Sequence, residues 1–556
     1  MTNWKAVSKT VAVVLVLVVA VALIATYLAL SPPYVTPTTP ATTPTSPTTL
    51  TTPATTTPQL KRTLIIAIPE EPMGLDVQQV TWSNEVHDMI FQPLVVLDEN
   101  MNIVPDLALS WEVTGEGTVL MFHIPSNAKF SNGDPVTAEA VKRSIERYKD
   151  ISPYAEDFAD VAEMIAIDEY TLKIILKQPA PYLWSVLVTN YGAPVNAEVA
   201  ERVGPDVFNR EPVGSGPYAV KEWVRGSHVV LTRNNNYKTN LPFVVNKGPN
   251  PYVDEVIIRF IPEDLTRITE LEAGRVDVVR GVPLEEVKRL RGNPNIQLYE
   301  TLAPGIHYIM VNLQKTPLND VRVRKAIMLA LNRDEIAQIL DNNVVPWHSF
   351  LSPSQICYNE TVETVAKTTY AHNIEAAKEL LREAGWVDTN GDGVVDKDGT
   401  PLTLTLLSPV DDPPLKKAAP LIQAQLAKVG IQVSIKEYTY DYIRELTNEW
   451  NFELALRRFS WADPDILIYL VHSVYGNYTY SNPEVDALLE LGRSVTDMIE
   501  RSEVYSEAQE ILLKDLPLIP LFVLKDYTAV NKNVKGLLVL PPYGTIFIND
   551  VWIEQK

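Results

Sequence analysis

The sequence predicts an α/β protein with two or three lobes. Residues 59–556 have the hydrophobic content of an ordinary globular protein, and roughly 500 residues are too many for one hydrophobic core. In the second half of this stretch, segments with strand patterns alternate with segments with helix patterns. Such alternation is typical of α/β lobes. No fixed-period repeat is visible, so the sequence does not indicate a repeat architecture.

Strand patterns dominate the start of this stretch. Residues 63–68 (TLIIAI) and 118–124 (TVLMFHI) are rich in strand-forming residues and are bounded by turn residues. A helix is predicted over 134–148, where Thr137 is a suitable N-cap and apolar residues recur at i, i+4 and i+7. Further strands are predicted over 171–177 and 253–261.

The second half alternates more regularly. Its clearest helix begins after Asn373, a suitable N-cap, and ends at Gly385, a residue type that commonly terminates helices. The elements predicted in this half are helices over 319–331, 373–385 and 421–430, and strands over 402–408 and 431–438.

An apolar segment near the N-terminus has the length of a membrane span. Residues 11–30 carry no charge and no proline, and at about 1.5 Å per residue such a helix spans about 30 Å, the thickness of a bilayer core. Lys5 and Lys9 precede it, so the positive-inside rule predicts a cytoplasmic N-terminus and an external remainder. We expect residues 1–31 to be a transmembrane anchor. The alternative is a cleaved signal peptide with its cleavage site at residues 29–31 (ALS).

A spacer rich in threonine and proline follows the apolar segment. Residues 32–58 carry no charge and have almost nothing apolar to bury, so they are predicted to be a disordered stalk. Threonine with proline is also the composition of O-glycosylated stalks, although an inert linker fits equally well. In either case the predicted arrangement is a domain tethered at a distance from the membrane.

Net charge and cysteine content exclude some binding partners and some covalent bonds. The net charge of −21 argues against nucleic acid or anionic lipid as a partner. Cys357 is the only cysteine, which rules out an internal disulfide and a lipid-modified cysteine after the apolar segment. Asn359 and Asn477 begin triplets that match N-glycosylation acceptors, as expected of a glycoprotein exposed outside the cell.

Enzymatic signatures are missing from the sequence. No phosphate-binding P-loop, G-x-S-x-G elbow or H-E-x-x-H motif occurs, and the seven histidines do not pair at metal-ligand spacing. Gly214–Gly216 (GSG) precedes strand-like sequence rather than a helix, so we interpret it as a tight turn. We therefore expect no catalytic residues and no cofactor.

One loop resembles a calcium-binding loop. Residues 388–399 (DTNGDGVVDKDG) have the spacing of an EF-hand loop, but Gly399 occupies the position where a bidentate glutamate normally closes the coordination shell. Two interpretations stay open, a hairpin turn and a weak calcium site. The candidate ligands are Asp388, Asn390, Asp392 and Asp396.

A short segment combines aromatic, acidic and basic residues. Arg458, Phe459, Trp461, Asp463 and Asp465 lie within eight positions of one another. An aromatic wall with an acid and a cation in one loop suits a polar or zwitterionic ligand.

Several blocks together resemble a known protein family, the extracellular solute-binding proteins of ABC importers in the oligopeptide, dipeptide and nickel group (family 5). The resemblance extends over most of residues 63–522. The first and longest block is residues 93–147, which contain DLALSW, a strand, KFSNGDP and the following helix. The later blocks, in order, are VGSGPYAVKEW, VVLTRNNNY, NDVRVRKAIMLALNRDEI, EAAKELLREAGWVDTNGDG and YSNPEVDALLELG.

The resemblance implies a bilobed α/β fold of the periplasmic-binding-protein kind (type II, with an extra subdomain) and a ligand cleft between the lobes. Lobe I is then expected to be assembled from separate segments of the chain. The implied assignment is 59–91, 176–272 and 525–556 for lobe I, 92–175 for an inserted subdomain and 273–524 for lobe II.

The resemblance also implies a function in transport. We expect a monomer, anchored at the surface of an archaeal cell, that captures oligopeptides and delivers them to an ABC permease with its ATPase subunits. A long stalk would keep the binding domain near the permease at a high effective concentration. An oligosaccharide is the alternative ligand, and nickel is a third.

The site residues implied by the resemblance lie on both sides of the cleft. Asp463 is the first choice for pairing with a ligand's amino group and Asp465 the second, although a structural role for Asp463 in capping a turn stays open. Arg458 is a candidate for a ligand carboxylate, or else faces solvent. Phe459 and Trp461 compete for the position of the family's tryptophan. Residues expected to line or shape the cleft are Trp82, Ser83, Gly214, Ser215 and Tyr218.

Overall fold

The computed structural model describes residues 62–248, 251–476 and 479–554. The expected anchor, the stalk and Asn477 lie outside these residues. None of the helices within the described ranges is both long enough and apolar enough to cross a membrane.

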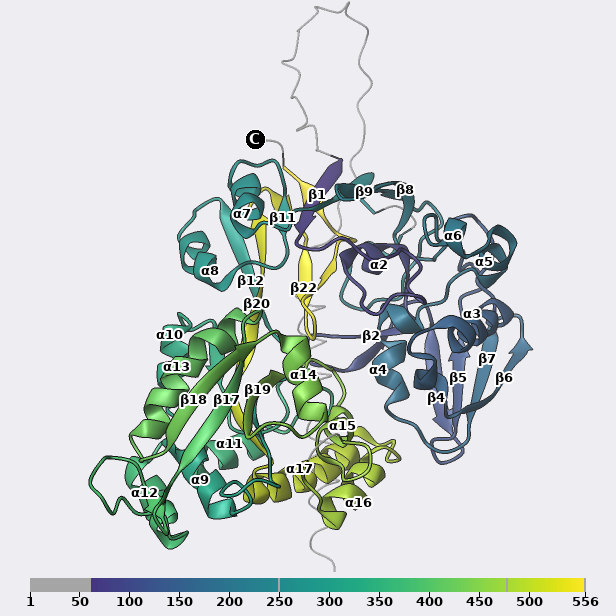
Figure 1. Cartoon of the computed structure of the whole chain (residues 1–556). Helices are drawn as coiled ribbons and strands as arrows, with labels where there is room; N and C mark the ends of the chain where they lie inside the picture. Colours follow the sequence, from purple (N-terminus) through teal and green to yellow (C-terminus); the bar gives the residue numbers. More distant parts are fainter. Residues whose placement is uncertain (1–61, 249–250, 477–478, 555–556) are drawn as a thin grey trace, which may run out of the picture. The chain divides into compact units, whose positions relative to one another are not determined.

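A sheet of twelve strands is the backbone of the fold (Figure 1). Ten strands form its continuous path, and β12 (Ile296–Leu302) and β14 (Val344–Pro346) pair separately with β20. The path runs β18 (Gln432–Tyr438), β17 (Thr403–Pro409), β19 (Leu454–Arg458), β13 (His307–Val311), β20 (Leu518–Asn531), β11 (Val278–Val279), β1 (Thr63–Ile68), β10 (Glu255–Phe260), β9 (His228–Arg233) and β8 (Tyr218–Val224).

Strand β20 belongs to both lobes. Its first half pairs antiparallel with β13 and β14, and its second half pairs antiparallel with β12 and β11. A second crossing runs beside it, because residues 303–306 connect β12 to β13 and the Ala303 amide donates to the Leu524 carbonyl at 2.9 Å. We call the part built on β1 and β8–β12 lobe I, and the part built on β13, β14 and β17–β19 lobe II.

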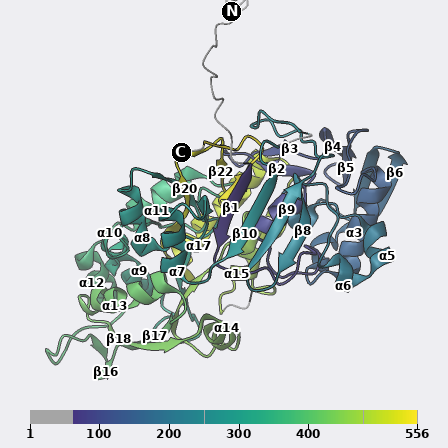
Figure 2. The same cartoon turned by 90° about the horizontal axis from the view of Figure 1, so that it is seen from above.

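Lobe I buries a sheet face that is continuous with the C-terminal segment. Figure 2 shows β1, β10, β9 and β8 side by side, in agreement with their pairing. Its main core joins β1 and β10 to Ile546, Val551 and Ile553 near the chain end. Its remaining elements are α2 (Glu85–Ile90), α5 (Ala197–Val203), α6 (Pro205–Phe208), α7 (Asp264–Glu272), α8 (Leu284–Arg291), β21 (Val534–Lys535), β22 (Leu538–Leu540), β23 (Thr545–Phe547) and β24 (Trp552–Ile553).

The inserted subdomain has its own sheet and its own core. Its sheet has the order β4-β5-β7-β6, and helix α3 packs against it through Val141, Ile145 and Tyr148. Its elements are β2 (Val95–Leu97), β3 (Ile103–Pro105), β4 (Ser110–Thr114), β5 (Val119–His123), α3 (Ala138–Ile151), η1 (Ala155–Phe158), β6 (Val161–Asp168), β7 (Thr171–Leu176), α4 (Leu183–Leu187) and η2 (Asn190–Gly192).

Lobe II surrounds its part of the sheet with helices and contains the largest core cluster, from Ile306 to Val523. Its helices are α9 (Val321–Ala330), α10 (Arg333–Ile339), α11 (Glu360–Thr369), α12 (Ile374–Glu383), α13 (Pro413–Ala427), α14 (Tyr440–Asn448), α15 (Ile466–Val471), α16 (Pro483–Gly492) and α17 (Met498–Asp515). A separate hairpin is formed by β15 (Asp396–Lys397) and β16 (Thr400–Pro401).

Local sequence signals account for most of these elements. The predicted caps are confirmed, since the Thr137 hydroxyl accepts from the Ala140 amide at 3.1 Å and the Asn373 side chain from the Ala376 amide at 2.9 Å. Helix α13 begins eight residues earlier than predicted. Asp412 caps it and two prolines follow at its start, where missing amide donors cost nothing.

The packing places two domain boundaries differently from the expectation. Residues 273–302 were expected in lobe II, but β11 pairs with β1, and α8 and β12 pack in the second core cluster of lobe I. The subdomain core also continues past residue 175, as far as Leu187. We therefore assign the start of lobe II to about residue 303, where the chain crosses.

The suspected calcium loop is a turn that satisfies its own carboxylates. Asp388 accepts from the amides of Gly391 at 2.7 Å and Gly393 at 3.0 Å, and Asp396 accepts from the Thr389 amide at 2.9 Å. In the described part of the chain, no three acidic, histidine or cysteine side chains converge as a metal site would require. Of the two interpretations left open, the geometry corresponds to the hairpin turn.

Asn359, the described member of the two glycosylation triplets, caps helix α11. Its side-chain oxygen accepts from the Thr361 amide at 3.0 Å, and its side-chain nitrogen donates to the Ser506 hydroxyl at 3.0 Å. The amide to which a glycan would be attached is thus engaged in the structure.

Candidate functional site

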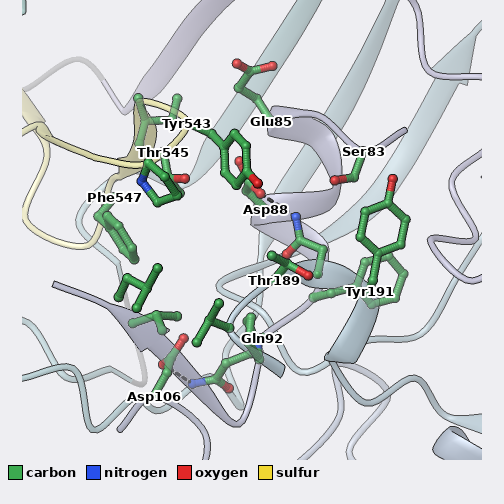
Figure 3. Close-up of a pocket in the computed structure, with 18 of the residues that line it drawn as sticks. Ser83, Glu85, Asp88, Gln92, Asp106, Thr189, Tyr191, Tyr543, Thr545 and Phe547 are labelled. Atoms are coloured by element: carbon green, nitrogen blue, oxygen red, sulfur yellow. Dashed lines mark hydrogen bonds between the residues drawn. The ribbon is translucent and has the colours of Figure 1, made fainter. Parts of the chain in front are cut away.

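A cavity of about 460 Å³ lies beside helix α2 (Figure 3). Its walls come mainly from residues 82–97, 185–191 and 541–549, which belong to lobe I and the inserted subdomain. Ser460 and Trp461 are its lining residues from lobe II. The volume is that of a small-ligand pocket, and the lining places it where the two lobes meet.

Helix α2 positions two acidic side chains of this wall. Asn84 caps the helix by accepting from the Val86 amide at 3.1 Å, and His87 accepts from the Asn84 amide at 3.1 Å. Burial lowers the pKa of His87 to about 4, so the ring is neutral and donates its other N–H to the Gly74 carbonyl. This cap sets the start of the helix and places Glu85 and Asp88, three residues apart, in the pocket lining.

Glu85 is paired with a guanidinium that the protein itself holds. The Arg280 Nε donates to Glu85 at 2.7 Å. The two other guanidinium nitrogens donate to the Thr528 hydroxyl at 2.5 Å and to the Tyr543 carbonyl at 2.8 Å. Arg280 therefore fastens α2 to β20 and to the C-terminal segment.

Asp88 faces the cavity without a cation of its own. One carboxylate oxygen accepts a hydrogen bond from the Asn190 side chain, and no hydrogen bond from a described residue reaches the other oxygen. Burial, followed by the neighbouring charge of Glu85, raises the pKa of Asp88 to about 7. The protein's own groups therefore stabilise the charged form of this carboxyl poorly.

Two other carboxyl groups line the cavity at a distance from α2. Asp106 accepts from the Gln92 amide at 2.7 Å and the Thr239 hydroxyl at 2.5 Å, and burial raises its pKa to about 6. Asp157 accepts from the Tyr148 hydroxyl at 2.8 Å, and burial raises its pKa as well. The charged groups of the described lining are thus four carboxyls and one guanidinium.

Aromatic side chains supply much of the remaining wall. Tyr543 spans the two lobes, because its hydroxyl accepts from the Ala462 amide at 3.2 Å. Trp461 is 38% exposed, and its backbone is fixed by hydrogen bonds to the Pro304 carbonyl at 2.7 Å and from the Gln355 side chain at 2.9 Å. The aromatic residues of the wall include Trp82, Tyr191, Trp461, Tyr543 and Phe547.

Comparison with known proteins identifies the family. Residues 102–480 match the family described as bacterial extracellular solute-binding proteins, family 5 Middle, and they make up more than half of the chain. This chain belongs to that family. Family-5 proteins are the extracytoplasmic substrate-binding components of ABC importers and are not enzymes.

The relatives match over most of their lengths. The chain is 30% identical over 458 residues to the probable D,D-dipeptide-binding periplasmic protein of Escherichia coli K12, covering 80% of this chain and 83% of that protein. It is 28% identical over 530 residues to the periplasmic oligopeptide-binding protein of Salmonella typhimurium LT2, covering 89% and 93%. The structure of the oligopeptide-binding protein of Bacillus subtilis with a nonapeptide has a TM-score of 0.68 at 26% identity, covering 90% and 100%.

The structure brings three of the expected site residues of this family-5 protein to the pocket. Trp82 and Ser83 lie just before α2, and Trp461 comes from lobe II. They form parts of the wall on opposite sides of the lobe boundary.

Asp463, the expected anchor for a ligand amino group, is a buried structural residue. Its side chain is 0% exposed, and both its oxygens accept from Arg501, at 2.7 and 2.9 Å. One of these oxygens also accepts from the Asp465 amide at 2.9 Å. The structure thus corrects the first choice, because this carboxylate is satisfied inside lobe II and does not line the pocket.

Asp465, the second choice, is likewise turned into the protein. It lies 3.0 Å from Arg493, whose guanidinium stacks on the Tyr182 ring at 4.9 Å from the centroid. Burial raises the pKa of Asp465 to about 7. This group of residues joins lobe II to the subdomain instead of facing the pocket.

Arg458 and Phe459 also lie away from the pocket lining. Arg458 pairs with Asp412 at 2.9 Å and stacks on the Tyr440 ring. Phe459 packs against the core of lobe II, and its amide donates to the Ile306 carbonyl at 3.3 Å. Of the two candidates for the lining aromatic position, the pocket contains Trp461.

Gly214, Ser215 and Tyr218 support the pocket from behind. A Cβ atom on Gly214 would lie 2.2 Å from the Ile90 carbonyl oxygen, so glycine allows this turn to approach the end of α2. Ser215 is buried, and the Tyr218 hydroxyl donates to the Val253 carbonyl at 3.1 Å. The role in shaping the cleft thus has a structural basis, without direct lining.

The most polar part of the pocket was missed from the sequence. Glu85 and Asp88 have the three-residue spacing of one helix face, and that is the only local signal. Asn190, Arg280 and Tyr543 come from distant segments that only the fold brings together.

Proposed function

We propose that this family-5 protein captures short peptides in the pocket between α2 and Trp461 and delivers them unchanged to an ABC permease. The observation that carries the proposal is a cavity of small-ligand size at the lobe boundary, in a chain whose relatives include proteins named for dipeptides and oligopeptides. The wall supports it, since it contains both amide or hydroxyl groups and aromatic rings, which suit a polar backbone with varied side chains.

Calorimetry on the full-length protein in detergent tests this proposal. Peptides of two to five residues are titrated alongside cello- and malto-oligosaccharides of similar mass. We expect saturable one-to-one binding of peptides with a micromolar Kd or tighter. Heat from the sugars alone would overturn the peptide assignment and leave the transport role intact.

An oligosaccharide is the second candidate, and the aromatic wall favours it. Flat rings such as those of Trp82, Trp461 and Tyr543 suit the apolar faces of sugars. The same titration decides between the two ligand classes.

We also propose that residues 1–31 anchor the protein in the membrane and that residues 32–58 are its stalk. The support is the charge-free apolar segment of bilayer length followed by the uncharged threonine–proline spacer. Carbonate extraction of membranes from expressing cells tests it: an anchored chain stays in the pellet, and release into the supernatant would contradict the anchor.

A further inference from the structure

The pocket is electrostatically one-sided next to α2. Glu85 and Asp88 lie on the same face of a short helix, and burial followed by the charge of Glu85 raises the pKa of Asp88. Arg280 is the guanidinium near them, and it is held by Glu85, Thr528 and Tyr543. Arg280 also lies 3.6 Å from Asp526, so this one cation serves more than one carboxylate. This end of the cavity therefore carries an excess of negative charge.

Within the part of the chain that the structure describes, Asp88 is the carboxylate of this pair that lacks a directly hydrogen-bonded cation. Glu85 has its guanidinium at 2.7 Å, whereas the partner of Asp88 among the described residues is the neutral Asn190 amide. Leaving a partly buried carboxylate without a cation is costly, and a charge-assisted hydrogen bond from a ligand would remove that cost.

Aromatic rings stand around the same end of the pocket. Figure 3 shows Tyr543 and Tyr191 directed into the cavity that Asp88 faces. The Tyr543 backbone is fixed by Arg280 and its hydroxyl by the Ala462 amide, so its ring has a defined position. A carboxylate combined with tyrosine rings is a favourable environment for an ammonium group, because the ring faces attract cations.

We propose that Asp88, supported by Glu85, binds an ammonium group of the solute, so that the protein selects ligands carrying a charged amine at this end. The inference rests on the proposed function: for a peptide, the N-terminal amine lies at Asp88. The residue proposed to bind the ligand's amine is therefore Asp88 on helix α2 of lobe I. It replaces Asp463 of lobe II, whose carboxylate is paired with Arg501.

The test compares probes that differ at the amine. Trialanine, N-methyl-trialanine and N-acetyl-trialanine are titrated into the full-length protein; methylation keeps the charge and adds bulk, whereas acetylation removes the charge. We expect acetylation to weaken binding about tenfold or more, because it removes a charge-assisted hydrogen bond. Methylation should weaken binding far less, because the charge remains. This comparison needs no variant, so it does not depend on whether a substituted chain folds.

Two variants locate the effect. In Asp88→Asn the preference for the free amine should disappear, while in Asp441→Asn, which removes a charge from an exposed side chain of α14, it should persist. Equal binding of the three peptides to the unsubstituted protein would overturn the ammonium site and leave peptide capture standing. A preference that survives in Asp88→Asn would also overturn it.

A sugar pair separates failure of the inference from failure of the proposed function. If no peptide binds but sugars do, the dimer of glucosamine is compared with the dimer of N-acetylglucosamine. Tighter binding of the free amine supports the ammonium site although the peptide assignment has failed, and equal or weaker binding overturns both. Absence of binding by all five probes also overturns both.

Discussion

At the scale of single residues, acidic side chains of similar appearance in the sequence have opposite roles. Asp463 is 0% exposed and chelated by Arg501, whereas Asp88 faces a cavity and has only an amide partner. The resemblance to the family favoured Asp463, because it follows Trp461 in the loop where peptide-binding relatives carry the aspartate for the ligand's amino group. The distinction depends on which distant residue supplies a guanidinium, and no local pattern encodes that.

Asp463 tests the structural assignment. Asp463→Asn leaves the fully buried Arg501 without its carboxylate, so we expect a loss of stability of about 3–5 kcal/mol, the usual result of breaking a buried pair from one side. Chemical denaturation measures it. In the folded fraction, free-amine and acetylated peptides should lose affinity equally; a selective loss for the free amine would return Asp463 to the binding site.

Asp88 should make stability depend on pH. Its pKa is raised from 3.8 to about 7 in the folded protein, so ionisation is disfavoured by folding and the carboxyl costs stability above pH 4. Asp88→Asn removes this cost. We expect the variant's Tm to exceed that of the unsubstituted protein most at pH 8, with the difference shrinking as the pH falls from 7 towards 4. A difference that is constant with pH would contradict the assignment.

At the scale of elements, strands and caps follow the sequence closely, while the connections between lobes do not. Residues 63–68 and the helix after Asn373 carry complete local signals, namely β-forming composition in one case and a cap with a glycine end in the other. The expected boundary placed residues 273–302 in lobe II, whereas β11 pairs with β1 of lobe I. This pairing joins strands about 200 residues apart, so no local signal predicts it. The same limit hid the crossing at residues 303–306.

Gly305 is the tightest point of that crossing. A Cβ atom there would lie 2.1 Å from the Phe459 carbonyl oxygen, so Gly305→Ala should force the crossing away from the Trp461 loop. We expect a loss of about 1–3 kcal/mol in stability and weaker ligand binding. Gly292→Ala is the matched control, since its nearest neighbour would be an ordinary contact at 3.5 Å. Equal effects of both changes would argue against a special role for the crossing.

The contact between the subdomain and lobe II depends on the Tyr182 ring. Arg493 lies on this ring while pairing with Asp465, so Tyr182→Leu should loosen the contact. Tyr182→Phe keeps the ring and loses only the hydroxyl bond to Asp160. Small-angle scattering without ligand should show a larger radius of gyration for the leucine variant alone. Equal radii of gyration for the unsubstituted protein and both variants would show that this contact does not hold the subdomain against lobe II.

At the scale of the whole molecule, the sequence is sufficient for the fold class and the family, because both depend on many dispersed signals. The family blocks, the alternating elements and the missing catalytic motifs all point to a solute-binding protein, and the comparisons agree. The pocket is different in kind. The acidic end of the pocket, next to α2, is formed by residues 85–88, 190, 280 and 543. These segments are distant in the sequence, so no local sequence pattern predicts that they meet.

Mass spectrometry of small molecules released by denaturing the natively purified full-length protein tests the central claim most directly. A capture protein with a pocket at its lobe boundary should release a small solute, unchanged and near one equivalent, and we expect peptides with free amines. Release of nothing after purification under conditions that retain ligand, or of a product covalently altered by the protein, would contradict the account.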